Sequence, residues 1–393
     1  MSKNKPLFAV YVMMYFVVTM QGFVFTGIID QVALELDLSE AAVGMFSSLY
    51  GYGAAIGVPL AMLVFSRIER SRSMKAMLLI TLLATAAFAV TDIYPLLLAL
   101  RFLIGLTSNS YNVLATAMAI GLFPSEKQGR AMAFYISGAS MSLVVGTPLV
   151  RLMLPYIHWR TIFLILAGIM LFALLYFLKK VRPTAQVTKH QTPRPSSLHY
   201  FKHSAVPIIL IFTFIMFVGS GSFQTYITVY MLHLFPQMEP LMSLFLFAWG
   251  LASFFGNLTG GWISDSIGYK RAMLLGALMQ TASIVGVILS PNTAWLSALC
   301  AITWLFWQWF TGLQINTGII RATNNSSDLI FSLKGSMLQL GSAVGATIAA
   351  TSMTLHGVRS ITRIILVTCI TITFLQALFL FFSGQLKPDD TGR

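Results

Sequence analysis

The sequence predicts an all-α membrane protein in which twelve spanning helices form two pseudo-symmetric six-helix bundles. Of its 393 residues, 57% are hydrophobic and only 9% are charged, whereas a soluble domain carries about 25% charged residues. The hydrophobic residues form runs long enough to cross a bilayer, which takes about 20 residues. Most Lys and Arg residues lie in the gaps on one side of these runs, and that bias is typical of a multi-span protein.

Twelve apolar runs of membrane length follow one another along the chain. The runs of the first half are 7–29, 43–65, 76–93, 96–122, 131–154 and 161–178. Those of the second half are 206–232, 240–261, 272–290, 293–320, 329–354 and 361–383. The first run is too long for the core of a signal peptide and has no small-residue cleavage site at its end. We therefore expect it to be retained as the first span.

The runs divide the chain into a bundle at 1–178, a connector at 179–205, a second bundle at 206–383 and a tail at 384–393. The connector has six basic residues, three prolines and no acidic residue, which indicates a solvated linker. A tight basic loop follows both the second and the eighth run, about 200 residues apart. This repetition predicts two parallel repeats related by an axis along the membrane normal.

The Lys and Arg residues also predict the orientation. The loops near 30–42, 92–95, 233–239 and 291–294 contain neither residue type. By the positive-inside rule, both termini and the connector are therefore cytoplasmic. The exceptions on the other side are Arg151, Arg160, Arg359 and Arg363.

Several other functions are disfavoured. The net charge of +13 comes from basic residues in short gaps, not from a solvated face that could bind nucleic acid. Cys300 and Cys369 lie inside apolar runs and the histidines lie in loops, so no metal site, disulfide framework or cofactor is expected. Without paired carboxylates or an H-E-x-x-H motif, an intramembrane enzyme is a remote alternative. Without a Walker loop, ATP is not the direct driver.

One loop carries a specific motif. It follows the eighth run and reads Gly261-Trp-Ile-Ser-Asp265-Ser-Ile-Gly268-Tyr-Lys270-Arg271. A carboxylate at a helix end can pair with arginines or with a neighbouring helix N-terminus, and glycine permits a sharp turn. The loop resembles the signature loop of the major facilitator superfamily, G-x-x-x-D-x-x-G-x-[KR]-[KR].

The corresponding loop of the first half is degenerate, with Ser66 and Glu69 in place of the signature Asp and Gly. A plain positive-inside anchor is one interpretation of these charges. The other is a latch that holds one conformation during transport. The candidate latch residues are Asp265, Gly268, Lys270, Arg271, Arg67 and Arg70.

Three further stretches strengthen the resemblance. Arg101-Phe-Leu-Ile-Gly105 resembles the R-x-x-x-G motif, Gly146-Thr-Pro148-Leu149 the antiporter G-x-P-L motif, and Trp159-Arg160-Thr-Ile-Phe163 the W-R-x-x-F entry to span six. In order over the first 165 residues, they are similar to bacterial drug, sugar and purine efflux permeases. The second half matches through its signature loop and layout. The resemblance implies the major facilitator fold and export of a small organic solute by alternating access, from a bacterial inner membrane.

Arg101 is the main candidate for a charged group inside the membrane. It lies about 9 Å into span four, at 1.5 Å per residue, and an intramembrane arginine is by default a functional residue. We expect it to pair with Asp30 at the outer end of span one, which could then exchange a proton against substrate. The alternative is that Asp30 is a solvated loop carboxylate.

Proton antiport depends on Asp30 alone. Relatives of this branch tend to read T-E-F-V-x-x-G in span one, but this chain has Gly22 in the place of that carboxylate. No Asp or Glu lies near the middle of any run. An importer or facilitator without proton coupling is therefore the alternative to an exporter.

Polar and aromatic residues inside the runs predict a solute cavity. Amides and aromatic rings suit an uncharged or zwitterionic solute, such as a drug, sugar, nucleobase or metallophore-like metabolite. Interhelical hydrogen bonds would explain about half of these residues, and Lys334 could instead extend to the membrane surface. We expect a monomer in the lipid bilayer. The candidates are Gln21, Asn109, Tyr111, Asn112, Arg151, Gln224, Tyr226, Tyr230, Trp304, Trp307, Gln308, Gln314, Lys334 and Gln339.

Overall fold

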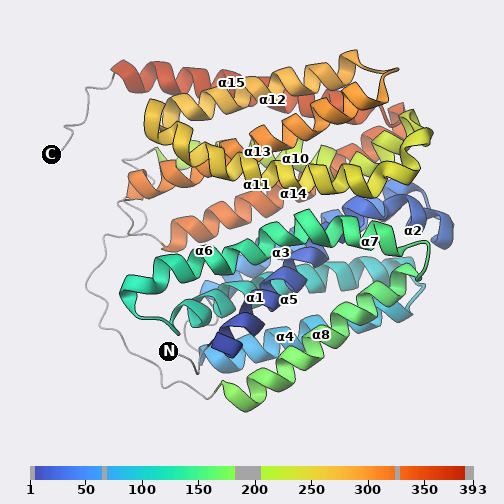
Figure 1. Cartoon of the computed structure of the whole chain (residues 1–393), viewed down its shortest axis with the longest axis vertical. Coiled ribbons are helices and arrows are strands. Elements are labelled where there is room, and N and C mark those ends of the chain that lie inside the picture. The colour runs from blue at the N-terminus through green and yellow to red at the C-terminus, as the bar shows by residue number, and fades with distance from the viewer. Residues whose placement is uncertain (1–4, 64–68, 182–204, 324–327, 386–393) are drawn as a thin grey trace.

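The computed structural model describes residues 5–63, 69–181, 205–323 and 328–385. Within these ranges, the chain is almost entirely helical and contains no strand. The helices form two bundles that lie side by side, with the N-terminal half in blue and green and the C-terminal half in yellow to red (Figure 1). Most of the predicted connector and of the tail lies outside the described residues.

The described residues of the N-terminal half form six helical passages, two of which are interrupted. Their elements are α1 (Lys5–Phe23), η1 (Val24–Gly27), α2 (Ile29–Leu36), α3 (Glu40–Leu63), α4 (Arg70–Val90), α5 (Tyr94–Ile120), α6 (Ser125–Met141), η2 (Ser142–Gly146), α7 (Thr147–Met153) and α8 (Trp159–Lys180). The break in span five precedes Pro148, which cannot donate a backbone hydrogen bond and so favours the π-helical turn η2. In span one, the 3-10 turn η1 separates α1 from α2.

The C-terminal half contains six passages that are continuous apart from one short 3-10 turn. They are α10 (Val206–Leu234), η3 (Pro236–Leu241), α11 (Met242–Ile267), α12 (Tyr269–Leu289), α13 (Ala294–Thr323), α14 (Asp328–His356) and α15 (Ser360–Gln385). The twelve passages match the twelve predicted runs. The predicted fold class is therefore confirmed.

Ten stretches of the described chain are long and apolar enough to cross a membrane. The other two passages, α5 and α14, are as long but more polar. Both pack closely against other helices: α5 against α3 and α4, and α14 between α10 and α3. Polar residues are tolerated on the faces of a span that meet other helices or a cavity, which explains why composition alone identifies ten spans.

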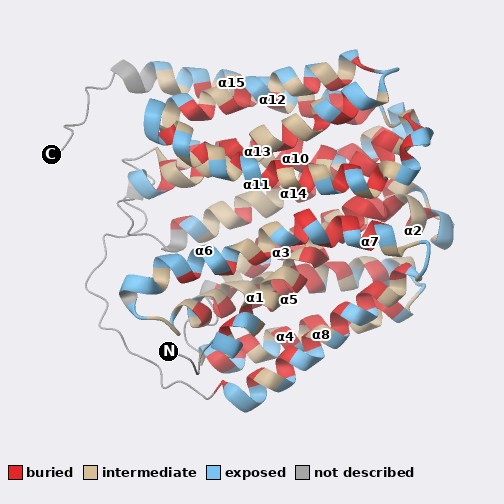
Figure 2. Cartoon of the chain, in the orientation of Figure 1, coloured by how far each residue is buried: buried red, intermediate tan, exposed pale blue. Residues whose placement is uncertain are grey.

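The lipid-facing surface is apolar. Large hydrophobic side chains are exposed along α8, including Phe172 and Leu175, and along α15, including Phe374 and Phe381. In Figure 2, exposed residues follow the outward faces of these two helices. Such a surface is stable in hydrocarbon and not in water, so the chain is a multi-span membrane protein.

The two ends of the bundle differ in charge. We call the end that contains Lys5, Lys180 and Val206 the connector end, and the opposite end the distal end. Most of the described basic residues lie near helix ends at the connector end, whereas the distal end contains Asp30, Glu35, Asp37, Glu40 and Asp92. This asymmetry agrees with the predicted orientation, and the cytoplasmic location of the termini stays a prediction.

Small residues bring helices together within each half. A Cβ atom at Gly53 would lie 2.1 Å from the carbonyl oxygen of Phe102 on α5, and one at Gly345 would lie 1.9 Å from that of Val218 on α10. These glycines therefore allow close packing of backbones, as the G-x-x-x-G spacing predicts. Each partner belongs to the same half as its glycine, so this close packing lies within each half.

Candidate functional site

A cavity of about 360 Å³ lies between the two halves. That volume is within the range of about 300–1,000 Å³ typical of small-molecule sites. Among the described residues that line it, none carries a fixed charge. The polar and aromatic ones are Tyr15, Thr19, Phe23, Thr26, Ser47, Tyr50, Asn109, Asn112, Gln224, Thr225, Trp309, Gln339 and Ser342.

Four of the predicted cavity residues line this cavity, two from each half: Asn109, Asn112, Gln224 and Gln339. The amide nitrogen of Asn109 on α5 donates to Tyr50 Oη at 3.3 Å and to the carbonyl of Gly105 at 3.1 Å. Gln339 Nε2 on α14 donates to Asn109 Oδ1 at 3.5 Å. This last contact joins the two halves inside the cavity.

In the N-terminal half, the structure places Gln21 and Tyr111 outside the cavity. Both side chains are fully buried, and Gln21 Nε2 donates to Thr85 Oγ1 at 2.8 Å. Gln21 therefore takes the interhelical role that was the alternative to cavity lining.

The C-terminal half shows the same pattern for Tyr226, Tyr230 and Gln314. Tyr226 packs against Gly44 across the halves and donates to the carbonyl of Ala346 at 3.4 Å, and Gln314 donates to that of Gly260 at 2.9 Å. The ring of Tyr230 packs against Phe223.

Three further candidates of the C-terminal half, all on α13, also miss the cavity. Trp304 is buried beside Trp249, and the ring of Trp307 packs against Phe310. Gln308 faces the core of its own half. The expectation that these three line the cavity is corrected, because Trp304 and Gln308 face the core of their own half and Trp307 packs along its own helix.

Lys334 is partly exposed on α14 and does not line the cavity, although the next residue, Gly335, does. It forms no ion pair within the described part of the chain. The sequence left two interpretations of Lys334, a cavity residue or a side chain that extends to the membrane surface. Its position near the start of α14 agrees with the second.

Several lining residues were not predicted. Tyr15, Thr19, Gly22 and Thr26 follow one another at helical spacing along span one. That spacing was the available signal, because residues three or four apart share one face of a helix. Tyr50, Trp309 and Ser342 carry no comparable signal in the sequence.

Arg101 does not pair with Asp30. Its side chain is fully buried on α5, Nε donates to the carbonyl of Phe46 at 3.1 Å, and Nη2 donates to that of Gln21 at 3.0 Å. The guanidinium also lies 4.8 Å from the ring centre of Phe25 and 4.9 Å from that of Tyr50, which stabilises a cation. Gln21 is in the last turn of α1, where carbonyls lack intrahelical partners. Arg101 therefore caps the end of α1.

Asp30 pairs with Arg151 instead. Arg151 Nη1 lies 2.7 Å from Asp30 Oδ1, and the two side chains are only 6% and 14% exposed. The same nitrogen donates to the carbonyl of Gly27 at 3.2 Å. The break at η1 starts the new helix α2, which carries Asp30 toward α7 and away from Arg101. Arg151 is thus not a cavity residue, and Asp30 is not a solvated loop carboxylate.

The distal end is closed by contacts between the halves. Thr228 Oγ1 on α10 donates to the carbonyl of Thr26 at 2.5 Å, and His233 Nε2 lies 2.8 Å from Glu40 Oε2. The cavity lies on the connector side of these contacts, where its lining extends to Val58 and Gly335. The structure therefore shows a conformation in which the halves meet at the distal end.

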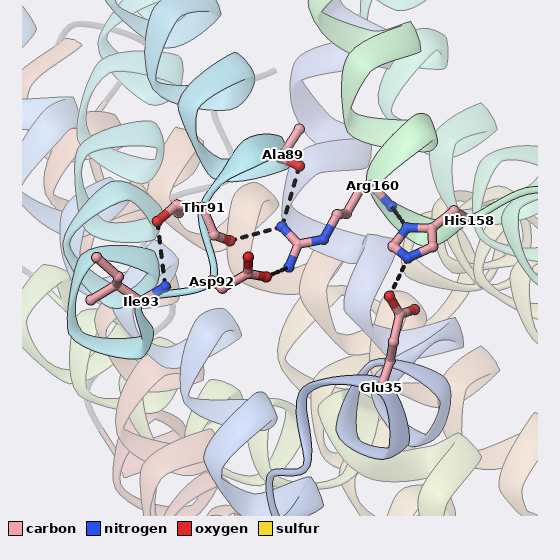
Figure 3. Close-up of polar contacts among 7 residues, drawn as sticks. All are labelled: Glu35, Ala89, Thr91, Asp92, Ile93, His158 and Arg160. Atoms are coloured by element: carbon pink, nitrogen blue, oxygen red, sulfur yellow. Dashed lines mark hydrogen bonds and ion pairs between the residues drawn. The ribbon is translucent and has the colours of Figure 1, made fainter.

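Contacts within the N-terminal half complete this end (Figure 3). Arg160 at the start of α8 pairs with Asp92 and donates to the carbonyls of Ala89 and Thr91 at 3.3 and 2.7 Å, next to the end of α4. A cation is favourable at a helix C-terminus. His158, the residue directly before α8, contacts Glu35. The distal position of Arg160, an exception to the charge bias, thus has a structural cause.

The signature loop forms a tight turn between α11 and α12. Gly268 has a φ of +83°, a backbone conformation that residues other than glycine rarely adopt. Asp265 is exposed and has no ion pair among the described residues, and Arg271 and Arg70 are also exposed. Lys270 lies 5.5 Å from the ring centre of Phe379, and Arg67 lies outside the described residues. The latch stays a prediction.

Comparison with known proteins identifies the family. Residues 8–346 match the family model described as Major Facilitator Superfamily. The chain is 26% identical to "Uncharacterized MFS-type transporter YbcL" of Bacillus subtilis over 85% of each chain. It is 24% identical to "Chloramphenicol resistance protein" of Streptomyces lividans, over 84% of this chain and 85% of that one.

Two further comparisons agree with this family and its fold. The chain is 20% identical to "Probable sugar efflux transporter" of Helicobacter pylori, over 85% of this chain and 86% of that one. The crystal structure of a nucleoside transporter superposes with a TM-score of 0.72 at 13% identity, over 94% of this chain and 98% of that one. At that identity the second similarity concerns the fold alone.

Proposed function

Because the chain belongs to the major facilitator superfamily, we propose that this transporter of small solutes exports an uncharged organic solute by alternating access. The observation that carries the proposal is the central cavity, which has polar, uncharged groups from both halves and lies behind a closed distal end. With the connector end in the cytoplasm of a bacterial cell, the cavity is placed to accept solute from inside. The name of the Helicobacter pylori relative, a probable sugar efflux transporter, supports the same direction.

Counterflow in proteoliposomes tests this proposal. Purified protein should exchange labelled for unlabelled solute without ATP, with chloramphenicol and D-glucose as the first probes. A strict requirement for ATP would contradict a secondary transporter. Inside-out and right-side-out vesicles then separate export from import.

Two candidate functions differ in proton coupling: a proton-coupled exporter and a facilitator without coupling. Asp30 is only 14% exposed and pairs with the Arg151 guanidinium, so an exporter could use it to carry a proton. A facilitator without proton coupling is favoured by Gly22 and by Arg101, which contacts carbonyls and no carboxylate among the described residues. A transport rate that is unchanged by pH gradients of either sign would select the facilitator.

A covalent link across the distal end should stop transport. In a background with Cys300 and Cys369 replaced by Ser, we expect the pair Thr26→Cys and Thr228→Cys to be bridged by oxidation or by a short bis-thiosulfonate reagent, because Thr228 already contacts the backbone of Thr26. Counterflow should fall by about tenfold or more and recover on reduction, since distal opening is required in each cycle. Each single-cysteine variant is the control. Full counterflow in the bridged protein would contradict alternating access.

A further inference from the structure

Two amide side chains on opposite halves line the cavity, and each has one atom without a hydrogen-bond partner in the described chain. Asn112 Oδ1 on α5 and Gln224 Nε2 on α10 have almost no solvent-accessible surface and no partner within the described chain. Both residues nevertheless line the cavity. A buried polar atom without a partner costs free energy, and native structures contain few of them. Neither atom has surface that faces the cavity, so each amide would turn about its last side-chain bond for a solute to complete its hydrogen bonding.

The neighbouring amides are satisfied, which singles out these two atoms. Asn109 donates to Tyr50 and Gly105 and accepts from Gln339. The other end of the Gln224 amide, Oε1, accepts from Ser220 Oγ at 3.4 Å. What remains is one acceptor on the N-terminal half and one donor on the C-terminal half.

The electrostatics of the described cavity lining disfavour a charged ligand. The described lining has no Asp, Glu, Lys, Arg or His, and Arg101 is fully buried behind Tyr50 with its own carbonyl partners. A charged solute would lose its hydration and meet no opposite charge, which is unfavourable. Trp309 and Phe23 instead line the cavity from opposite halves and can contact an apolar part of the solute.

We propose that the cavity selects uncharged, hydroxyl-bearing solutes, and that Asn112 and Gln224 contact the same solute molecule from the two halves. The inference rests on the proposed transport function. A hydroxyl group both donates and accepts, so one hydroxyl can donate to Asn112 Oδ1 while another accepts from Gln224 Nε2. Such a solute joins the two halves through its own hydrogen bonds.

Matched probes test the ligand class. Full-length protein in proteoliposomes is given D-glucose, D-gluconate or D-glucosamine, which are similar in size and are respectively uncharged, anionic and cationic. Uridine is a second uncharged, hydroxylated probe and belongs to a different chemical class, the nucleosides. We expect counterflow of glucose or uridine to exceed that of both charged probes by about tenfold or more, because unpaired polar groups discriminate strongly. Counterflow of a charged probe equal to that of the uncharged ones would overturn the inference.

Variants test the two residues. Asn112→Leu and Gln224→Leu should each raise the KM of the transported probe by about tenfold or more. Gln308→Leu is the matched control, because its amide is also buried and unpartnered but faces the core of the C-terminal half. It should transport normally. Thermal unfolding midpoints of all variants show that they fold. Wild-type KM in both cavity variants, or an equal rise in Gln308→Leu, would overturn the inference.

The outcomes also separate this inference from the proposed function. Counterflow of gluconate or glucosamine alone would overturn the ligand class and leave the transport function supported. Movement of no probe at all would count against both. Counterflow of glucose or uridine that is reduced only by the two cavity variants would support both.

Discussion

Replacing Asp30 with alanine is expected to lower the free energy of unfolding by about 3–5 kcal/mol, the usual cost of removing one partner of a buried ion pair. The side chains of Asp30 and Arg151 are 14% and 6% exposed, so water cannot replace the lost carboxylate. The guanidinium would retain the carbonyl of Gly27 as its partner. Denaturant or thermal unfolding in detergent micelles measures the change.

A second mutation distinguishes the pair from the individual residues. Asp30→Ala combined with Arg151→Met should regain a large part of the stability, because the uncompensated charge is gone. Glu35→Ala is the matched control at the same end, since its pair with His158 is about half exposed and such pairs contribute about 0–1 kcal/mol. A loss for Asp30→Ala no larger than that for Glu35→Ala would show that the buried pair is not a determinant of stability.

Replacing Arg101 with lysine is expected to reduce transport by about tenfold or more, even though the positive charge is kept. The guanidinium reaches the carbonyl of Gln21 on α1 and that of Phe46 on α3 from two different nitrogens. A lysine ammonium has three donors on one nitrogen, so it cannot occupy both of the positions from which Nε and Nη2 reach the two carbonyls. The break after α1 would then lose its cap, and Gly22 and Thr26 would shift at the cavity wall.

Initial counterflow rates at equal protein amounts measure this effect. Unfolding midpoints recorded beside them should also fall, because hydrogen bonds from a charged donor contribute about 1.5–3 kcal/mol each. Arg72→Lys is the control: Arg72 pairs with Glu69 at the connector end and is 76% exposed. Unchanged transport by Arg101→Lys would refute the capping role and point to charge alone.

The candidate site was only partly predictable from the sequence. Asn109, Asn112, Gln224 and Gln339 were identified because amides are rare inside membrane spans. Gln21 and Gln314 have the same composition signal, yet they bond to neighbouring helices. Residue type indicates that a partner is needed. It does not indicate whether the partner is a solute or a helix.

The charged residues show the same limit. The depth of each residue within its predicted span suggested Arg101 and Asp30 as partners, since both lie near one end of the bundle. The short turn η1 carries Asp30 onto α2 and toward Arg151, and the depth of a residue in its span does not reveal such a turn. Pairing depends on direction as well as depth.

By itself, the sequence determined the twelve helices, their two repeats and the membrane class. Hydrophobic run length and charge bias are local properties, and the thickness and polarity of the bilayer act on them directly. Only the tertiary structure decided which side chains face the cavity, which charges pair, and at which end the halves meet. Those properties depend on the rotation of each helix about its axis and on its neighbours, and residues far apart in the chain set both.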